Sequence, residues 1–250
     1  MFEQTRIMEG IARCSRYSFG PNRLHYCGPD ANAELRSLIE HGETNPELSV
    51  LLRQFKTLYP YLQYISRSAG IAEPFDAQVV EAYWLGNALL EKSKMEKLHR
   101  FFVEDLSVKK KVGGREFEWL EEKIRQGAVP HHSFHVLNVW QMTGHTDKLD
   151  EVERMDECLV NFGTVTSVRG PEITVMTEPL TYAHGKLALG TPREKKITRR
   201  LEVEYDIEQI QPGQIVSFHW SVPCEIISET QARNLRKYIV QSIAFANQTI

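Results

Sequence analysis

The second half of the sequence contains one cysteine and one histidine whose chemistry stands out, Cys158 in "CLVNFGTV" and His219 in "PGQIVSFHWSV". A thiolate is a soft ligand and a neutral imidazole is a borderline one, so the pair suits a transition metal. Two protein ligands would leave further coordination positions open. The alternative is structural, with Cys158 as a small buried hydrophobic residue and His219 as a hydrogen-bonded strand residue.

A second candidate site lies near the start of the chain, in "CSRYSFGPNRLHYCGPD". Cys14 and Cys27 bracket this stretch and His25 lies between them, while the turn signals "GPN" and "CGPD" each define a backbone conformation. Because the stretch is polar, aromatic and rigid, we expect a loop. It forms either part of a functional site or an ordered cap over the helices.

Three histidines in "PHHSFHVLNVWQMTGH" could belong to the same second site. If the segment is helical after Pro130, His131 and His135 have i, i+4 spacing, and His132 and His135 have i, i+3 spacing. Helical metal sites use such pairs but add carboxylates or a third ligand at recognisable positions, and neither HExxH nor ExxH is present. Helix capping and hydrogen bonding in the core are therefore the alternatives to a metal or catalytic role.

The four cysteines form no CxxC pair, so their spacing predicts no closed structural zinc site. A chain of 250 residues with 42% hydrophobic residues can bury a core without disulfides, and we expect free thiols or metal ligands. The net charge of -3 gives no reason to expect nucleic acid as a partner. No stretch is apolar enough to span a membrane and the start does not resemble a secretory signal, so we expect a cytoplasmic protein.

The pattern of apolar residues changes near the middle of the chain. Helical spacing dominates from about residue 30 to 149, as in "PFDAQVVEAYWLGNALLEK" and in "REFEWLEEKIRQG", where Gly127 is a stop signal. Short β-branched runs follow, "TVTSV", "ITVMT", "RRLEVEY" and "QIVSF", and a last helix begins after Ser228. The sequence predicts an α+β fold: an all-helical domain (1–154), then a small antiparallel, OB-like β-barrel with a C-terminal helix (155–250).

The predicted second domain resembles the HypC/HupF family of [NiFe]-hydrogenase maturation chaperones. Members of that family begin with a cysteine in "C-L-x-x-x-G-x-V", reach a strand "G-x-x-V-x-V-H-x-G-x-A" and end in a helix. Here "CLVNFGTV", "PGQIVSFHWSV" and "CEIISETQARNLRKYI" occupy these positions in the same order, over about the last third of the chain. The resemblance implies a HypC-like barrel in which Cys158 and His219 are the iron-handling cysteine and histidine.

The resemblance also implies a cargo and partners. The cargo would be iron, as an Fe(CN)2CO fragment, and the partners a maturation protein of the HypD type and the hydrogenase large subunit. Three features differ from the family pattern: Cys158 follows Glu157 and so has no free α-amino group, "TYAHGKLALGTPREKKITRR" lengthens the barrel, and "HWSVPC" replaces a turn of small residues. These differences put the partner and the cargo in question.

The lengthened segment carries a basic cluster, which comprises Arg193, Lys195, Lys196, Arg199 and Arg200. Charged runs at turns are common and Glu194 interrupts this one, so we favour a solvated hairpin over a surface that binds an acidic partner. The opening of the chain, "SRYSFGPNRLHYCGPD", resembles an uncharacterised bacterial and archaeal family that shares "SRYSFxPNxLxYCGPD". That resemblance supports a helical part followed by a barrel and implies no mechanism.

The sequence therefore favours a cytoplasmic metal carrier, a HypC-like chaperone that binds or transfers an iron fragment, rather than a turnover enzyme. A second hypothesis is an enzyme whose helical domain holds a metal or an organic cofactor, makes a diatomic iron ligand and delivers it through the barrel. It predicts an enclosed pocket between Cys27 and His135. A third hypothesis is an interaction module whose barrel has lost its cargo.

Overall fold

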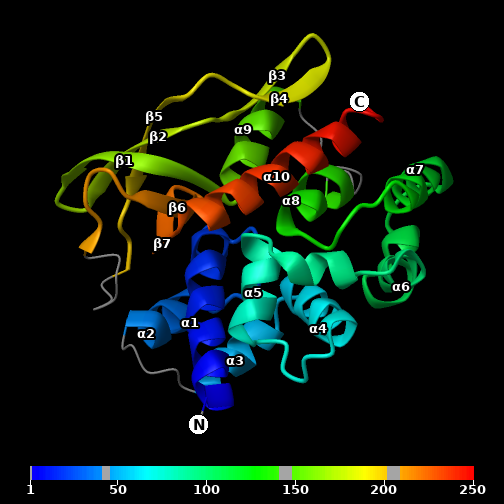
Figure 1. Ribbon diagram of the computed structural model, residues 1–250, viewed down its shortest axis with the longest axis horizontal. Coiled ribbons are helices and arrows are strands. Elements are labelled where there is room, and N and C mark those ends of the chain that lie inside the picture. The colour runs from blue at the N-terminus through cyan, green and yellow to red at the C-terminus, as the bar shows by residue number, and fades with distance from the viewer. Residues whose placement is uncertain (1, 41–45, 141–147, 202–208) are drawn as a thin grey trace.

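The computed structural model describes residues 2–40, 46–140, 148–201 and 209–250. Its helices are α1 (Phe2–Arg23), α2 (Asn32–Glu40), α3 (Pro46–Arg53), α4 (Leu58–Ala69), α5 (Ala77–Trp84), η1 (Ala88–Lys92), α6 (Met95–Arg100), η2 (Phe101–Asp105), η3 (Val108–Lys110), α7 (Gly114–Arg125), α8 (His132–Phe134), η4 (His135–Trp140), α9 (Lys148–Cys158) and α10 (Glu229–Ala246). The strands are β1 (Asn161–Arg169), β2 (Glu172–Thr177), β3 (Leu180–Ala183), β4 (Lys186–Leu189), β5 (Arg193–Thr198), β6 (Ile215–His219) and β7 (Val222–Ile226). The predicted α+β class, with antiparallel sheets and a C-terminal helix, is confirmed (Figure 1).

Local signals in the sequence explain where several helices begin and end. The Asp76 side chain accepts a hydrogen bond from the backbone N–H of Gln78 and so caps α5. Gly127 follows α7 with a φ of +94°, which glycine adopts without strain. Ser228 and Gln231 form a reciprocal capping box at the start of α10, which confirms the predicted helix start.

The prediction of a loop over residues 14–30 is wrong for residues 14–23, which form the last turns of α1. Pro21 lies inside this helix, where its ring has no N–H to donate to the carbonyl four residues earlier, that of Tyr17. The carbonyl oxygen of Tyr17 instead lies 2.7 Å from Nδ1 of His219. A residue far along the chain therefore supplies the hydrogen bond that the proline removes.

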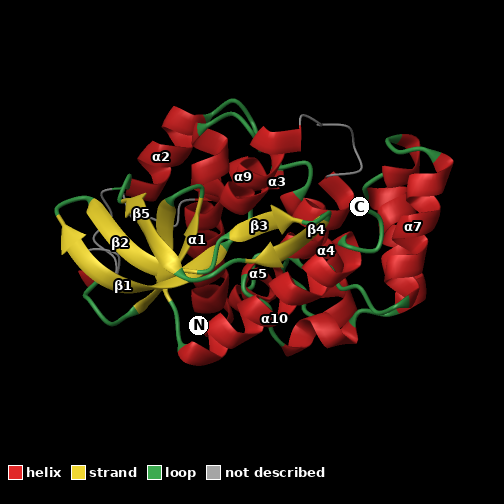
Figure 2. Ribbon diagram, turned by 90° about the horizontal axis from the view of Figure 1, so that it is seen from above, coloured by secondary structure: helices red, strands yellow, loops and turns green. Residues whose placement is uncertain are grey.

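Five strands form one antiparallel sheet in the order β5-β2-β1-β6-β7, and β3 and β4 pair separately (Figure 2). Three of the predicted strands lie in β1, β2 and β6, while most of the fourth, "RRLEVEY", falls at 202–208, outside the described residues. Cys158 does not begin the first strand as expected. It is the last residue of α9, and β1 begins at Asn161.

Helix α1 packs directly against the turn between β6 and β7, and this contact joins the helical region to the sheet. A Cβ atom on Gly20 would lie 2.7 Å from the carbonyl oxygen of His219 and 3.0 Å from Cβ of Trp220, so only glycine allows this approach. The expected domain boundary at residues 154 and 155 lies within α9 and stays a prediction. Among the described helices, none combines the length and the apolar character needed to cross a membrane.

A buried polar network strengthens the same contact. The Tyr17 hydroxyl donates to a carboxylate oxygen of Glu225 on β7 at 2.8 Å and lies 2.8 Å from Oγ of Ser217 on β6. The guanidinium of Arg13 is 3.1 Å from the other carboxylate oxygen of Glu225. Because these groups are away from water, each depends on the others for its hydrogen bonds.

We predict that Tyr17→Phe lowers the free energy of unfolding by roughly 1–3 kcal/mol, because it leaves buried partners of the hydroxyl unsatisfied. Denaturant titration monitored by circular dichroism measures the change. Tyr182→Phe is the matched control, since Tyr182 is 54% exposed and should lose less than about 0.5 kcal/mol. Equal stability of the two variants would contradict the importance of the network.

Candidate metal centre

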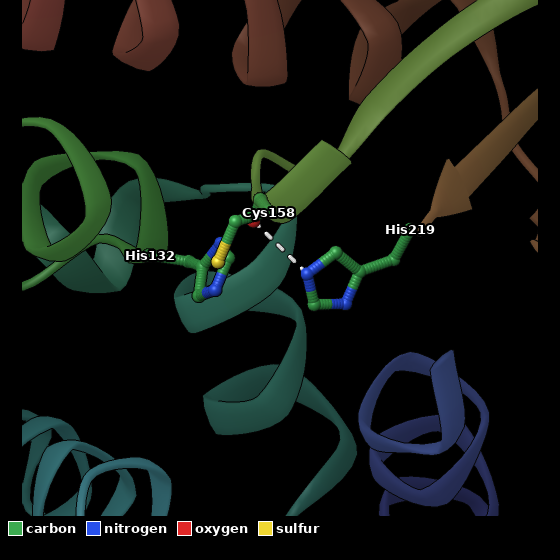
Figure 3. Close-up of side chains that lie close together, drawn as sticks. All are labelled: His132, Cys158 and His219. Atoms are coloured by element: carbon green, nitrogen blue, oxygen red, sulfur yellow. Dashed lines mark hydrogen bonds between the residues drawn. The ribbon is translucent and has the colours of Figure 1, made fainter. Parts of the chain in front are cut away.

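Three side chains from separate segments converge on one point: His132 of α8, Cys158 of α9 and His219 of β6. One ligand atom from each residue lies within 4.8 Å of the corresponding atoms of the other two. Figure 3 shows the Cys158 thiol extending towards the His132 ring, with the His219 ring on its other side. The structure thus brings together the predicted Cys158 and His219 pair and one histidine from the second candidate site.

The three side chains face a cavity of about 120 Å³. Six of its lining residues are aromatic, in addition to the histidines: Tyr26, Phe55, Tyr83, Trp84, Trp140 and Trp220. Among the described residues that line it, none is Asp, Glu, Lys or Arg. The site is therefore a small, mostly apolar cavity in which a few polar groups are concentrated.

His219 is the last residue of β6, and the two residues that follow it, Trp220 and Ser221, both have positive φ angles, of 53° and 55°. Its Nδ1 atom is 2.7 Å from the Tyr17 carbonyl oxygen and its Nε2 atom is 2.9 Å from the Cys158 carbonyl oxygen. Burial lowers the pKa of His219 to about 4, so the ring is neutral and carries one hydrogen. The shorter contact favours the hydrogen on Nδ1, with Tyr17 orienting the ring; the Nε2 lone pair then faces the Cys158 carbonyl, so that contact must open before Nε2 binds a metal.

His132 lies in the short helix α8, which continues into the π-helix η4. The C-terminal helix holds this segment in place. The Asn138 side chain donates to the Ser242 carbonyl at 3.0 Å, and the Ser133 and Ser242 hydroxyls are 2.8 Å apart. The His132 side chain is buried, and its Nδ1 atom has no hydrogen-bond partner among the described residues. A buried polar atom without a partner is costly, and a bound ligand or metal would remove that cost.

Burial raises the pKa of the Cys158 thiol to about 12, and the nearby Cys27 acts in the same direction. The Trp220 side chain lies close enough to lower this pKa, with a smaller effect. Burial also holds the pKa of His132 well below its ordinary value. At neutral pH the metal-free site therefore contains a protonated thiol and two neutral imidazoles.

The other residues of the second candidate site are dispersed. Cys27 and His135 line the same cavity, and Nδ1 of His135 is 3.1 Å from the Tyr61 hydroxyl. His131 lies outside the described lining and caps α8, since its Nδ1 accepts from the backbone N–H of Ser133. Cys14 is fully buried in α1, and His25 is an exposed residue whose Nδ1 is 3.2 Å from Asp30.

The basic cluster lies largely on strand β5 rather than at a turn. Lys195 forms ion pairs with Asp156 at 3.2 Å and Glu157 at 2.6 Å, and Lys196 pairs with Glu172 at 3.1 Å. Arg193, at the start of β5, and Arg200, which follows it, are exposed, and Arg199 is half-buried. At least two of the five basic side chains are therefore paired within the chain.

The sequence analysis did not identify the aromatic wall of the cavity. The rings of Tyr26 and Trp220 stack with their centroids 4.3 Å apart, and Tyr26 is 53% exposed, so this pair forms a part of the cavity wall that reaches the surface. The ring centroid of Trp84 lies 4.6 Å from that of His132 and 5.6 Å from that of His219. The one available signal was the bulky "HWS" where the HypC-like pattern has small residues.

The buried histidines predict loss of stability in acid. Burial lowers the pKa of His131 to about 3 and those of His135 and His219 to about 4, whereas an unfolded histidine titrates near 6.5. As the pH falls below about 6.5, the unfolded chain binds protons that the folded chain does not. The free energy of unfolding should therefore fall between pH 7 and 5, by roughly 1–2 kcal/mol per histidine.

Urea titrations at several pH values test this prediction. His131→Asn keeps a capping side chain at the start of α8 and should reduce the pH dependence, because it removes one such histidine. His184→Asn is the control, since His184 is exposed and asparagine accepts its φ of +53°. The same pH dependence in both variants would contradict a neutral, buried His131.

Comparison of the sequence with known proteins gives a match to a protein family. No curated protein and no solved structure matches the chain. The family described as "Family of unknown function (DUF6390)" matches residues 6–250. This range contains the three residues of the candidate metal centre as well as Tyr17 and Pro21. The chain therefore belongs to the DUF6390 family.

Proposed function

We propose that the chain binds a transition metal ion through His132, Cys158 and His219. The convergence of these three ligand atoms, each within 4.8 Å of the others at one cavity, carries the proposal. One thiolate and two imidazoles suit iron, copper or zinc better than magnesium or calcium, which prefer oxygen ligands. The backbone contact from Tyr17 to Nδ1 of His219 is the kind that orients a metal-binding histidine.

We further propose that the bound metal is cargo, and that the protein is an accessory protein of [NiFe]-hydrogenase maturation. The resemblance of "CLVNFGTV", "PGQIVSFHWSV" and the last helix to the HypC/HupF family supports this function. An Fe(CN)2CO fragment has six light atoms besides its iron, and about 150 Å³ accommodates the six carbon atoms of benzene, so the cavity of about 120 Å³ would have to widen to hold it. The cargo would be an Fe(CN)2CO fragment, received from a HypD-type partner and delivered to a hydrogenase large subunit.

The proposal includes the finer fold expected from the sequence, a closed OB-like barrel. The edge strands of the five-stranded sheet, β5 and β7, contact each other, and the N–H of Thr198, the last residue of β5, donates to the carbonyl of Ser221, the residue before β7, at 2.9 Å. Contact between two edges favours closure of the sheet. In this arrangement His219 lies at the rim of the barrel, facing α1.

One observation favours a second candidate function, a metal-dependent enzyme. That hypothesis predicts a pocket between Cys27 and His135, and both residues line the same cavity as the metal ligands. An enclosed cavity beside a metal excludes water from a reaction, whereas a carrier needs a way to release its cargo. Transfer of metal to a partner without turnover would support the carrier, and catalytic consumption of a substrate would support the enzyme.

We predict that binding of one divalent ion at pH 7 releases about one proton. The Cys158 thiol must lose its proton to become a ligand, whereas both imidazoles are already neutral. Consequently the apparent affinity should rise about tenfold per pH unit through the neutral range. A pH indicator in weakly buffered solution measures the release during a cobalt titration. An unchanged release from Cys158→Ser would contradict ligation by the thiolate.

The iron proposal predicts an infrared signature in protein purified without oxygen from cells that make a [NiFe]-hydrogenase. Wild-type protein should contain iron with cyanide and carbonyl stretching bands, and Cys158→Ala, His219→Ala and His132→Ala should each lose them. Cys14→Ala is the matched control, because Cys14 is a buried thiol outside the described lining of the cavity. If the protein contained iron but showed no such bands, the proposed metal site would stand and the proposed hydrogenase cargo would be contradicted.

A further inference from the structure

The charge balance of the candidate metal centre specifies its remaining ligand. Metal-bound cysteine is a thiolate and metal-bound histidine is neutral, so a divalent ion that brings no anionic ligand of its own retains one unit of positive charge at this site. No Asp, Glu, Lys or Arg is among the described residues that line the cavity. An isolated charge in an apolar cavity is strongly disfavoured, and no carboxylate among the described lining residues neutralises it.

Glu157 is the acidic residue nearest in sequence to the centre, and its charge is already balanced. Its carboxylate lies 2.6 Å from Nζ of Lys195 and accepts hydrogen bonds from the Ser221 hydroxyl at 2.8 and 3.1 Å. Glu157 is also outside the described lining of the cavity. Because its carboxylate already pairs with Lys195, a negatively charged molecule that enters the cavity would complete the compensation.

The hydrogen-bonding groups of the wall also favour an anion. The indole N–H groups of Trp84 and Trp220 are buried and make no hydrogen bond of normal geometry among the described residues, although the sulfur atoms of Cys14 and Cys158 lie near them. An indole N–H can only donate, so the indole of Trp220 can donate to an anion bound beside Cys158. Trp220 follows His219 directly and its side chain lies close to the Cys158 thiol, whereas the ring of Trp84 lies beside those of His132 and His219.

We infer that the metal centre binds a small monoanion as its exogenous ligand, held in the cavity beside the indole of Trp220. The volume of about 120 Å³ limits it to about five non-hydrogen atoms, since the metal ion occupies part of the space. The ligand contributes the negative charge that a divalent ion requires and accepts a hydrogen bond from the indole. This inference rests on the proposed metal site and names the class of ligand that the site selects.

A spectroscopic titration of the cobalt(II)-loaded full-length protein tests this inference. The first step is the cobalt titration itself, in which a thiolate-to-cobalt absorption band that Cys158→Ser lacks establishes the metal site. Absence of that band overturns the proposed function and this inference with it. Azide, cyanate, imidazole and benzoate are then added separately, and the cobalt absorption reports their binding.

Azide and cyanate should bind at least about tenfold more tightly than imidazole, which is neutral but also small. Benzoate, an anion with nine non-hydrogen atoms, should produce no change because it does not fit. With cobalt bound, tighter binding of imidazole than of azide would overturn the charge argument. Binding of benzoate would overturn the size limit. Either outcome would leave the metal site itself intact.

Trp220→Phe tests the hydrogen bond separately, because phenylalanine keeps a ring against Tyr26 and removes the N–H group. The azide affinity should fall by about tenfold, the effect of losing one hydrogen bond to a charged group, while the imidazole affinity stays unchanged. Trp119→Phe is the matched control, since Trp119 lies on α7 beneath Arg115 and outside the described lining. Equal losses for azide and imidazole would show that Trp220 acts only through packing.

Discussion

The carbonyl group of Tyr17 is the point on which the candidate metal centre depends. Pro21 removes the N–H that would normally pair with this carbonyl in α1, and His219 lies within hydrogen-bond distance of it. The same contact fixes the position of the imidazole ring and favours the hydrogen on Nδ1, so that Nε2, 2.9 Å from the Cys158 carbonyl oxygen, keeps its lone pair. A helix defect in the first 25 residues thus orients a side chain that is 202 residues away in the sequence.

The other two predicted ligands are positioned by separate packing contacts. Helix α10 binds the segment α8–η4 through Ser242, which fixes the backbone around His132. Cys158 is the last residue of α9. The backbone N–H of Trp220 donates to the backbone carbonyl of Glu157, which connects this end of α9 to the turn after β6. The centre therefore forms only when the helical region, the sheet and the C-terminal helix have all packed together.

The local elements could be predicted from the sequence and the assembled site could not. Capping at Ser228 and the alternating runs in β1, β2 and β6 depend on neighbouring residues, so they can be read directly. The helix through Cys14 and Pro21 was missed because a Pro-Asn pair after glycine normally indicates a turn, and the compensating group lies on β6. The joining of His132 to Cys158 and His219 depends entirely on long-range packing, which no spacing rule describes.

The burial of the centre has a consequence for the exchange of any cargo. Tyr26 and Trp220 form a part of the cavity wall that reaches the surface, and Trp220 is the residue directly after His219 in a turn with two positive φ angles. Such a turn is strained and persists only where its surroundings hold it, and here α1 does so through the close approach at Gly20. A movement of this turn would act directly on His219, because His219 precedes Trp220. Opening the cavity at this turn would therefore also disturb a predicted ligand, so a partner that moved the turn would both expose the metal and weaken its binding.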